Sequence, residues 1–331
     1  MGTVKLSVLG AGAWGTALAA SWAPHHRVTL WGRDAAELDA MREARVNTRY
    51  LPGCPLPDTL HLDPDFNAAV DDAELLIIAV PSSGLRTTLA ALAARPRLPS
   101  VFWVCKGFEH GSRKLPHQLI AELLPNHTQT GVLSGPSFAQ EVAHGYPTAL
   151  TLASRDSALA QHLAEALSGH RLRIYAHDDV IGAEIGGAVK NVMAIAAGIC
   201  DGLSLGHNAR AALITRGLAE MTRLGVRLGG HFETFMGLSG LGDLVLTTTG
   251  DLSRNRQVGL RLARGQPLDS ILTELGHVAE GVTTAREVAA LAGEIGIDMP
   301  ITRAVCQVLC EGLPAAQAVD ALLNRDIKAE F

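Results

Sequence analysis

The stretch 4-VKLSVLGAGAWGTALAASW-22 decides the fold of this chain. A short apolar run, Val4–Leu9, leads into a turn with glycines at Gly10, Gly12 and Gly15, and a helix-forming segment, Thr16–Trp22, follows. A strand, a GxGxxG turn and a helix in this order are typical of a dinucleotide-binding βα unit. The first glycine permits the tight turn, the second lets the backbone approach a pyrophosphate, and the third allows close helix packing. In this context the pattern favours a nucleotide site over a glycine-rich turn without a ligand.

Strand and helix patterns alternate through the first half of the chain. Apolar runs predict further strands at 28–32, 75–80, 101–105, 131–133, 148–153 and 172–175. Helical periodicity appears between them at 85–94, 116–124 and 157–167. We therefore expect an α/β fold, with a Rossmann-like doubly wound sheet domain over residues 1–180. Ligands bind beyond the carboxyl ends of the strands in such sheets, which is where Arg33, Lys106 and the turn Gly135–Ala139 fall.

The second half predicts helices alone. Helical segments are expected at 181–201, 209–228, 251–264, 268–275, 281–295, 301–311 and 315–324. An all-α C-terminal domain over residues 181–331 is the natural interpretation of this pattern.

The first of these helices, 181-IGAEIGGAVKNVMAIAAGICD-201, carries one lysine, Lys190, among apolar and small residues. The positions that share its face are Ala183, Gly186, Gly187, Ala194 and Ala197. Because that face has no bulk, we expect a large group to lie against it, with the ammonium pointing at it. A lysine in such surroundings suits proton transfer near neutral pH. The alternative is a lysine whose stem packs while its head reaches water.

Arg33 bears on the choice of cofactor. An NAD-selective site usually ends the second strand with Asp or Glu, which binds the ribose hydroxyls. Here Arg33 stands at that point, followed by Asp34. A guanidinium can pair with a 2′-phosphate, so the sequence favours NADP(H) and leaves NAD(H) open. A solvated surface arginine is the alternative.

Two stretches of the second half carry further polar groups. Gly237–Leu244 contains three glycines and predicts a loop that approaches a ligand, with Asp243 able to hold Lys190 or to accept a substrate hydroxyl. Ser253-Arg254-Asn255 stands near a helix start, which suits a phosphate group. Glu280 precedes a later helix. Helix capping is the alternative role for Asp243, Ser253 and Glu280.

Composition limits the class of protein. The chain has 331 residues, 47% of them hydrophobic, and a net charge of −5, which argues against a nucleic-acid binder. No secretory signal and no membrane span are expected. The five cysteines form no CxxC pair and indicate reduced thiols in a cytoplasmic protein. The thirteen histidines form no HExxH motif, so no metal site is predicted. A homodimer stays open.

The assembled motifs resemble the bacterial NAD(P)-dependent glycerol-3-phosphate dehydrogenases along both halves of the chain. The matching segments are GAGAWGTALA (10–19), VTLWGRD (28–34), SGPSFAQEVA (134–143), GGAVKNVMAIAAG (186–198), ALITRGLAEM (212–221), GLSGLGDLVLT (237–247) and SRN (253–255). The resemblance implies reversible reduction of dihydroxyacetone phosphate to sn-glycerol 3-phosphate, which supplies phospholipid synthesis.

The resemblance also implies roles for single residues. Lys190 matches the family's proton donor and acceptor. The positions that match substrate contacts are Lys106, Gly135, Ser137, Lys190, Asp243, Ser253, Arg254 and Asn255. Beside Gly10, Gly12 and Gly15, the positions that match cofactor contacts are Ala13, Trp14, Arg33, Lys106, Ala139, Arg254, Val278 and Glu280.

The sequence leaves two alternative functions, and each fits its motifs less well. A 3-hydroxyacid dehydrogenase of related two-domain build would space its lysine and asparagine one helical turn apart, whereas Lys190 and Asn191 are adjacent. A non-catalytic NADP(H) sensor would need neither a lysine in the cleft nor a phosphate-binding segment.

Overall fold

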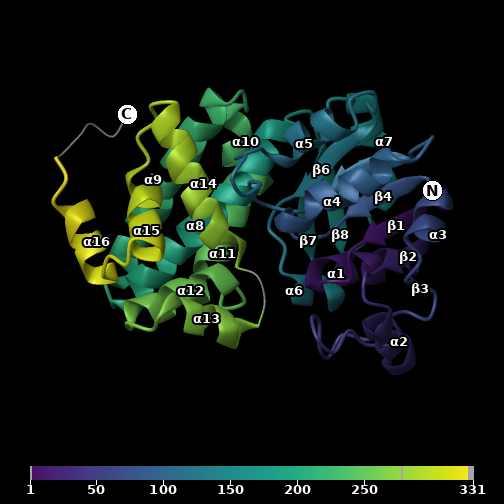
Figure 1. Cartoon of the computed structure of the whole chain (residues 1–331), viewed down its shortest axis with the longest axis horizontal. Coiled ribbons are helices and arrows are strands. Elements are labelled where there is room, and N and C mark those ends of the chain that lie inside the picture. The colour runs from purple at the N-terminus through teal and green to yellow at the C-terminus, as the bar shows by residue number, and fades with distance from the viewer. Residues whose placement is uncertain (1, 277–278, 327–331) are drawn as a thin grey trace. The chain divides into compact units, whose positions relative to one another are not determined.

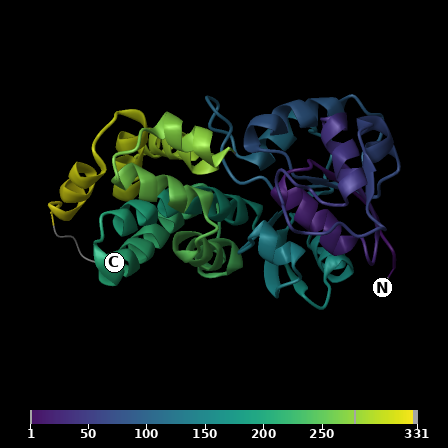
Figure 2. The same cartoon turned by 90° about the horizontal axis from the view of Figure 1, so that it is seen from below.

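A computed structural model describes residues 2–276 and 279–326 (Figures 1 and 2). The chain divides into two compact units. Unit 1 comprises Met1–Lys106 and Lys114–Glu184, and unit 2 comprises Gly107–Arg113 and Ile185–Phe331. The segment Gly107–Arg113 thus belongs with the second half of the chain although it lies inside the first.

Unit 1 is built on one eight-stranded sheet. Its strands are β1 (Lys5–Leu9), β2 (Arg27–Trp31), β3 (His61–Asp63), β4 (Leu75–Ile78), β5 (Ser100–Trp103), β6 (Thr130–Ser134), β7 (Thr148–Ala153) and β8 (Leu172–His177). Their order across the sheet is β3-β2-β1-β4-β5-β6-β7-β8. All neighbours are parallel except β6 and β7, which run antiparallel. The reversal of strand order at β1 and β4 makes this a doubly wound sheet, so the predicted fold class is confirmed for this unit.

Helices cover both faces of the sheet. They are α1 (Ala13–Trp22), α2 (Ala35–Ala44), α3 (Phe66–Asp71), α4 (Ser82–Ala93), α5 (Pro116–Leu123), α6 (Ala139–Ala143) and α7 (Ser157–Leu167). The strand β4 shows why two layers form. Leu75 and Ile77 belong to one apolar core, shared with α1, α2 and α7, while Leu76 and Ile78 belong to a second, shared with α3, α4 and α5. Alternate residues of a strand point to opposite faces, so both faces must be buried.

Among its described residues unit 2 contains helices and connecting loops but no strand, as the sequence predicts. Its elements are α8 (Val180–Gly202, entering from unit 1), α9 (Gly206–Arg227), α10 (Phe232–Met236), the π-helix η1 (Leu238–Gly242), α11 (Asp243–Thr249), α12 (Arg254–Ala263), α13 (Leu268–Leu275), α14 (Glu280–Glu294), α15 (Pro300–Cys310) and α16 (Ala315–Leu323). The expected loop at Gly237–Leu244 is therefore wrong, because η1 and α11 make this stretch helical.

Glycines let α8 approach its neighbours closely. A Cβ at Gly198 would lie 2.1 Å from the carbonyl oxygen of Arg256, and one at Gly259 would lie 2.0 Å from that of Ile195. These two glycines therefore set the crossing of α8 and α12. Among the described residues α8 alone is long and apolar enough to cross a membrane, and 94% of its most apolar window is buried inside the protein, as in a core helix.

Candidate active site

The glycine motif follows the carboxyl end of β1. Two of its glycines are tightly packed against the protein, and the third borders open space. Gly10 has a φ of +130°, and a Cβ there would lie 2.7 Å from the carbonyl group of Ala79. A Cβ at Gly15 would lie 2.0 Å from the carbonyl oxygen of Gly10. A Cβ at Gly12 would meet nothing within 4 Å. Gly10 and Gly15 are thus required by the packing of the protein, while Gly12 borders open space that suits a cofactor phosphate.

The N-terminus of α1 faces this space without a side-chain cap. The helix begins at Ala13 after Gly12, and its first helical hydrogen bond runs from Thr16 N to Gly12 O over 2.9 Å. The amides of the first turn have no partner within the helix, so they are suited to bind an anion. Trp14, in the same turn, has a buried indole nitrogen with no hydrogen-bond partner among the described residues.

The end of β2 carries Arg33 and Asp34 in different roles. The Asp34 carboxylate caps α2 by accepting from Ala36 N at 3.0 Å and Glu37 N at 3.2 Å. Arg33 is exposed. Asp34 is therefore engaged in holding the helix, and Arg33 is the residue at this strand end that is able to reach a ligand.

Three residues predicted to contact substrate meet at the ends of β5 and β6. The Lys106 ammonium donates to the carbonyl oxygen of Gly135 at 3.0 Å. The Ser137 hydroxyl donates to the same oxygen, also at 3.0 Å. Ala139 begins α6 and packs with Trp14 on one small apolar cluster, so these two predicted cofactor residues are neighbours in unit 1.

In unit 2 the predicted lysine pairs with the predicted aspartate. The Lys190 ammonium donates a hydrogen bond to the Asp243 carboxylate. The side chains are 8% and 0% exposed. Lys190 therefore does not extend into bulk solvent.

The small-residue face of α8 packs differently from expectation. A Cβ at Gly186 would lie 2.1 Å from the carbonyl oxygen of Ser239, so the backbone of η1 occupies the position where a large ligand was expected. This contact comes one turn before Lys190 and Asp243 on the two helices, and it sets the distance between them.

The start of α12 joins two more predicted residues to the same region of unit 2. The Ser253 hydroxyl caps α12 by accepting from Arg256 N at 3.2 Å, so this residue has the helix-capping role that the sequence offered as an alternative. The Asn255 amide donates to the Asn191 side-chain oxygen at 3.0 Å and accepts from Gly281 N at 3.1 Å. Arg254 is the first residue of α12 and is exposed.

Two contacting side chains were missed by sequence reasoning. Asn191 holds Asn255, and its position directly after Lys190 was the available signal. Thr247 donates to Asp243 O at 2.6 Å from four residues further along α11, a spacing that places it on the same helical face. Glu280 is the first residue of α14, and the predicted Val278 lies outside the described residues.

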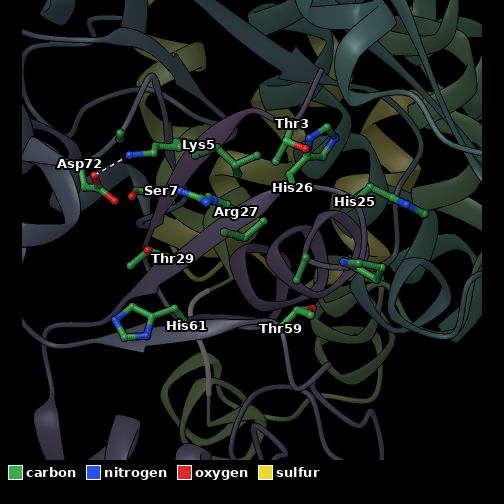
Figure 3. Close-up of a pocket in the computed structure, with 15 residues that line it drawn as sticks. Thr3, Lys5, Ser7, His25, His26, Arg27, Thr29, Thr59, His61 and Asp72 are labelled. Atoms are coloured by element: carbon green, nitrogen blue, oxygen red, sulfur yellow. Dashed lines mark hydrogen bonds and ion pairs between the residues drawn. The ribbon is translucent and has the colours of Figure 1, made fainter. Parts of the chain in front are cut away.

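A pocket of about 610 Å³ lies elsewhere in unit 1 (Figure 3). It is lined by Lys5, Arg27 and His61, at or near the amino ends of β1, β2 and β3, with Lys5 paired to Asp72 at 3.0 Å. Because β1, β2 and β3 are parallel, these residues lie at the amino ends of the strands, whereas Gly10 follows the carboxyl end of β1. None of the predicted site residues that the structure describes lines this pocket. Within 2–276 and 279–326, no three His, Cys, Asp or Glu side chains gather as a metal site would require.

Known proteins resemble this chain in both its N-terminal and its C-terminal half. Family models for the N-terminus and C-terminus of NAD-dependent glycerol-3-phosphate dehydrogenase match residues 5–160 and 179–320. A protein from Thiobacillus denitrificans named glycerol-3-phosphate dehydrogenase [NAD(P)+] is 78% identical over 99% of this chain and 100% of its own length. The crystal structure of glycerol-3-phosphate dehydrogenase from Coxiella burnetii is 44% identical, with a TM-score of 0.92, over 98% of this chain and 99% of that one. The yeast enzyme is 28% identical, with a TM-score of 0.81, over 96% and 99%.

Proposed function

The chain belongs to the NAD-dependent glycerol-3-phosphate dehydrogenase family, and we propose how its residues share the reaction. It is an enzyme that interconverts dihydroxyacetone phosphate and sn-glycerol 3-phosphate with NAD(P)(H). The family resemblance inferred from the motifs is confirmed, and it takes precedence over the 3-hydroxyacid dehydrogenase and the NADP(H) sensor.

We propose that Lys190 is the acid and base of the reaction. One observation carries this proposal: its ammonium is buried and hydrogen-bonded to the fully buried Asp243. During reduction the C2 carbonyl oxygen becomes an alkoxide, and Lys190 donates the proton that this oxygen takes up. The same ammonium polarises the carbonyl beforehand, because a shielded positive charge interacts strongly with developing negative charge. In the oxidation direction Lys190 accepts the proton.

Asp243 and Thr247 orient the lysine. The carboxylate fixes the ammonium, and Thr247 is hydrogen-bonded to the backbone oxygen of Asp243 at 2.6 Å. A lysine side chain has several rotatable bonds, and holding its head group in place reduces the loss of conformational freedom on reaction.

Arg254 and the start of α12 are proposed to bind the substrate phosphate. A guanidinium is suited to a phosphate group because it donates two parallel hydrogen bonds. Ser253 and Asn255 fix the helix start from which Arg254 extends, through their bonds to Arg256 N, Asn191 and Gly281 N. In unit 1, Lys106 and Ser137 both donate to the carbonyl oxygen of Gly135, and these three residues are proposed as further polar contacts to the substrate.

The residues present fit a dinucleotide. When bound, NAD(P)H supplies the hydride. We propose that Gly10, Gly12 and Gly15 with the amides of Ala13 and Trp14 bind its pyrophosphate, as the open space at Gly12 supports. Ala139, Lys106, Arg254, Val278 and Glu280 are proposed as further cofactor contacts. Because Asp34 is engaged as a helix cap, Arg33 supports a preference for NADP(H) over NAD(H).

The two parts of the chain have separate tasks in this proposal. Residues 1–180 bind the cofactor, and residues 181–331 hold the catalytic lysine and the phosphate-binding helix. The product supplies glycerophospholipid synthesis, and we place the enzyme in the cytoplasm. A homodimer is also proposed, and the exposed Phe232, Met236 and Val245 of α10 and α11 are its candidate surface. Light scattering of wild type and Phe232→Asp tests this assembly.

One assay tests the proposed reaction. The loss of NADPH absorbance is followed with dihydroxyacetone phosphate and, separately, with 3-oxoacids. The expected result is turnover of the phosphorylated ketone that falls by about a hundredfold or more in Lys190→Ala. Equal turnover of a 3-oxoacid would contradict the assigned substrate, and an active Lys190→Ala would remove the lysine from the mechanism.

A further inference from the structure

The segment Gly107–Arg113, here called the strap, belongs to unit 2, although the residues before and after it belong to unit 1. The chain leaves unit 1 after Lys106, adds the strap to unit 2, and returns to unit 1 at Lys114. A connection between a strand and the next helix of the same sheet does not need such a path. The contacts of the strap in unit 2 are therefore not needed merely to connect β5 to α5.

A buried carboxylate of α14 holds the strap. The carboxyl side chain of Glu287 is only 5% exposed. Its Oε1 accepts from the backbone N of Gly111 at 3.3 Å and lies 2.7 Å from the Nδ1 of His110. Burying a carboxylate costs free energy unless it is hydrogen-bonded. The contacts with the strap therefore offset the cost of burying Glu287.

A second glutamate of the same helix holds the end of the strap. The Arg113 guanidinium pairs with Glu294, whose side chain is 58% exposed. Glu287 and Glu294 are seven residues apart, which is close to two full helical turns. They therefore lie on one stripe of α14, and the strap follows this stripe.

The same stripe begins with a proposed cofactor contact. Glu280 lies seven residues before Glu287, about 10 Å away along the helix axis. The residue that immediately precedes the strap is Lys106, a proposed contact of both substrate and cofactor. Two proposed site residues are thus connected to the same helix stripe, Glu280 directly and Lys106 through the strap.

We propose that Glu287 is a positioning residue for the dehydrogenase reaction. It anchors the strap on α14 and thereby fixes the backbone from which Lys106 extends. It acts through Lys106 and needs no contact with substrate. The inference rests on the proposed role of Lys106 in binding dihydroxyacetone phosphate.

Four variants of the full-length enzyme test this role. Glu287→Ala removes both strap contacts, and His110→Ala removes one. Glu294→Gln is the matched control, because it weakens an exposed pair on the same stripe and the same strap. Lys106→Ala tests the underlying role of the lysine. The measurements are kcat, KM for dihydroxyacetone phosphate, and hydrogen exchange of the amides of residues 107–113.

We expect Glu287→Ala to raise KM for dihydroxyacetone phosphate about tenfold or more and to lower kcat much less, because loss of placement mainly weakens substrate binding. The strap amides should exchange faster. His110→Ala should show a smaller rise in KM, and Glu294→Gln should stay within about twofold of wild type.

The outcomes separate the inference from the proposed function. A wild-type KM in Lys106→Ala would contradict the role of Lys106 itself. An impaired Lys106→Ala beside a wild-type KM in Glu287→Ala would overturn the inference alone. If Glu287→Ala does not fold, Glu287→Gln and His110→Ala decide the matter, and a wild-type KM in both overturns the proposal.

Discussion

The ammonium of Lys190 on α8 and the carboxylate of Asp243 on α11 form an ion pair that is almost completely shielded from solvent. Each group depends on the other, because a buried charge without a partner is strongly unfavourable. Asp243 is also the first residue of α11, so the pair fixes the lysine to a helix start. The pair supports the proposed role of Lys190 as proton donor, because it holds the ammonium in one orientation.

The first prediction concerns the two members of this pair. Lys190→Ala should lower kcat by about 10²–10⁴-fold, the usual contribution of a general acid, and leave cofactor binding nearly intact. Asp243→Asn should lower kcat and also reduce the free energy of unfolding, because it leaves the ammonium without its counter-charge. Steady-state kinetics, cofactor titration by fluorescence and urea denaturation measure these three effects. A Lys190→Ala enzyme with wild-type kcat would contradict the assignment.

The second prediction concerns phosphate binding by α12. Arg254→Ala should raise KM for dihydroxyacetone phosphate, because a charge-assisted hydrogen bond contributes about 1.5–3 kcal/mol, or roughly tenfold to a hundredfold. Arg261→Ala is the control, since it removes a guanidinium from the last turn of the same helix, where it pairs with Glu274. At saturating NADPH, which offsets any loss of cofactor affinity, activity with a ketone that lacks the phosphate should be equally low in wild type and Arg254→Ala. A further loss with that ketone would argue against a phosphate contact.

Local sequence patterns were sufficient for much of unit 1. The strand Thr148–Ala153 and the helix Ser157–Leu167 have the predicted bounds. The helix is fixed by its periodicity, and its Asp156 cap accepts from Leu159 N. The strand β3 was missed because it has three residues and only Leu62 is buried. Its structure comes from pairing with β2, and a short window of sequence does not contain that information.

The same distinction between local pattern and tertiary packing applies to the candidate active site. The residue types Lys190 and Asp243 were predicted, since each stands in an unusual sequence context. The helical form of Gly237–Gly242 was not, because glycines usually favour loops. Here close packing requires them: a Cβ at Gly240 would lie 2.1 Å from the carbonyl oxygen of Phe235. Likewise the bond between Asn191 and Asn255 depends on how α8 crosses α12, which is a property of tertiary packing.

The third prediction concerns cofactor choice. Arg33→Ala should lower the ratio of kcat/KM for NADPH to that for NADH by about tenfold or more, because a phosphate contact is lost while the rest of the cofactor site stays. Asp34→Asn is the matched control. Asparagine caps a helix as well as aspartate, so this variant should keep both α2 and the coenzyme ratio. A changed ratio in Asp34→Asn would instead show that the carboxylate contacts the ribose.

The fourth prediction concerns pH and Glu220. This side chain is 1% exposed, and it accepts from Ile301 N at 2.6 Å and from the backbone N and hydroxyl of Thr302 at 3.1 and 3.0 Å. Burial raises the pKa of its carboxyl, against the opposing effect of these hydrogen bonds. Because the pKa of Glu220 is higher in the folded than in the unfolded protein, its protonation stabilises the folded state. This contribution to the free energy of unfolding is complete below the ordinary pKa of 4.5 and is lost as the pH rises through the folded-state pKa.

Glu220→Gln removes this titration. The free energy of unfolding of wild type, measured relative to Glu220→Gln by urea denaturation, should therefore fall as the pH is raised from about 4.5. A difference between the two proteins that stays constant with pH would show that the burial of Glu220 does not control its protonation.

The fifth prediction separates two helical glycines by what surrounds them. Gly198→Ala places a methyl group 2.1 Å from the backbone oxygen of Arg256, so α8 and α12 must move apart. We expect it to reduce the free energy of unfolding by about 1–3 kcal/mol or more, as overpacking usually does. Gly293, near the end of α14, has nothing within 4 Å of its Cβ position. Gly293→Ala should therefore raise the free energy of unfolding by about 0.5–1 kcal/mol, because alanine loses less backbone entropy in a helix.

Urea denaturation of both variants measures these two changes, and equal effects would show that α8 and α12 do not meet at Gly198. Since Asn255 and Arg254 stand at the start of the displaced α12, Gly198→Ala should also raise KM for dihydroxyacetone phosphate, whereas Gly293→Ala should leave it unchanged.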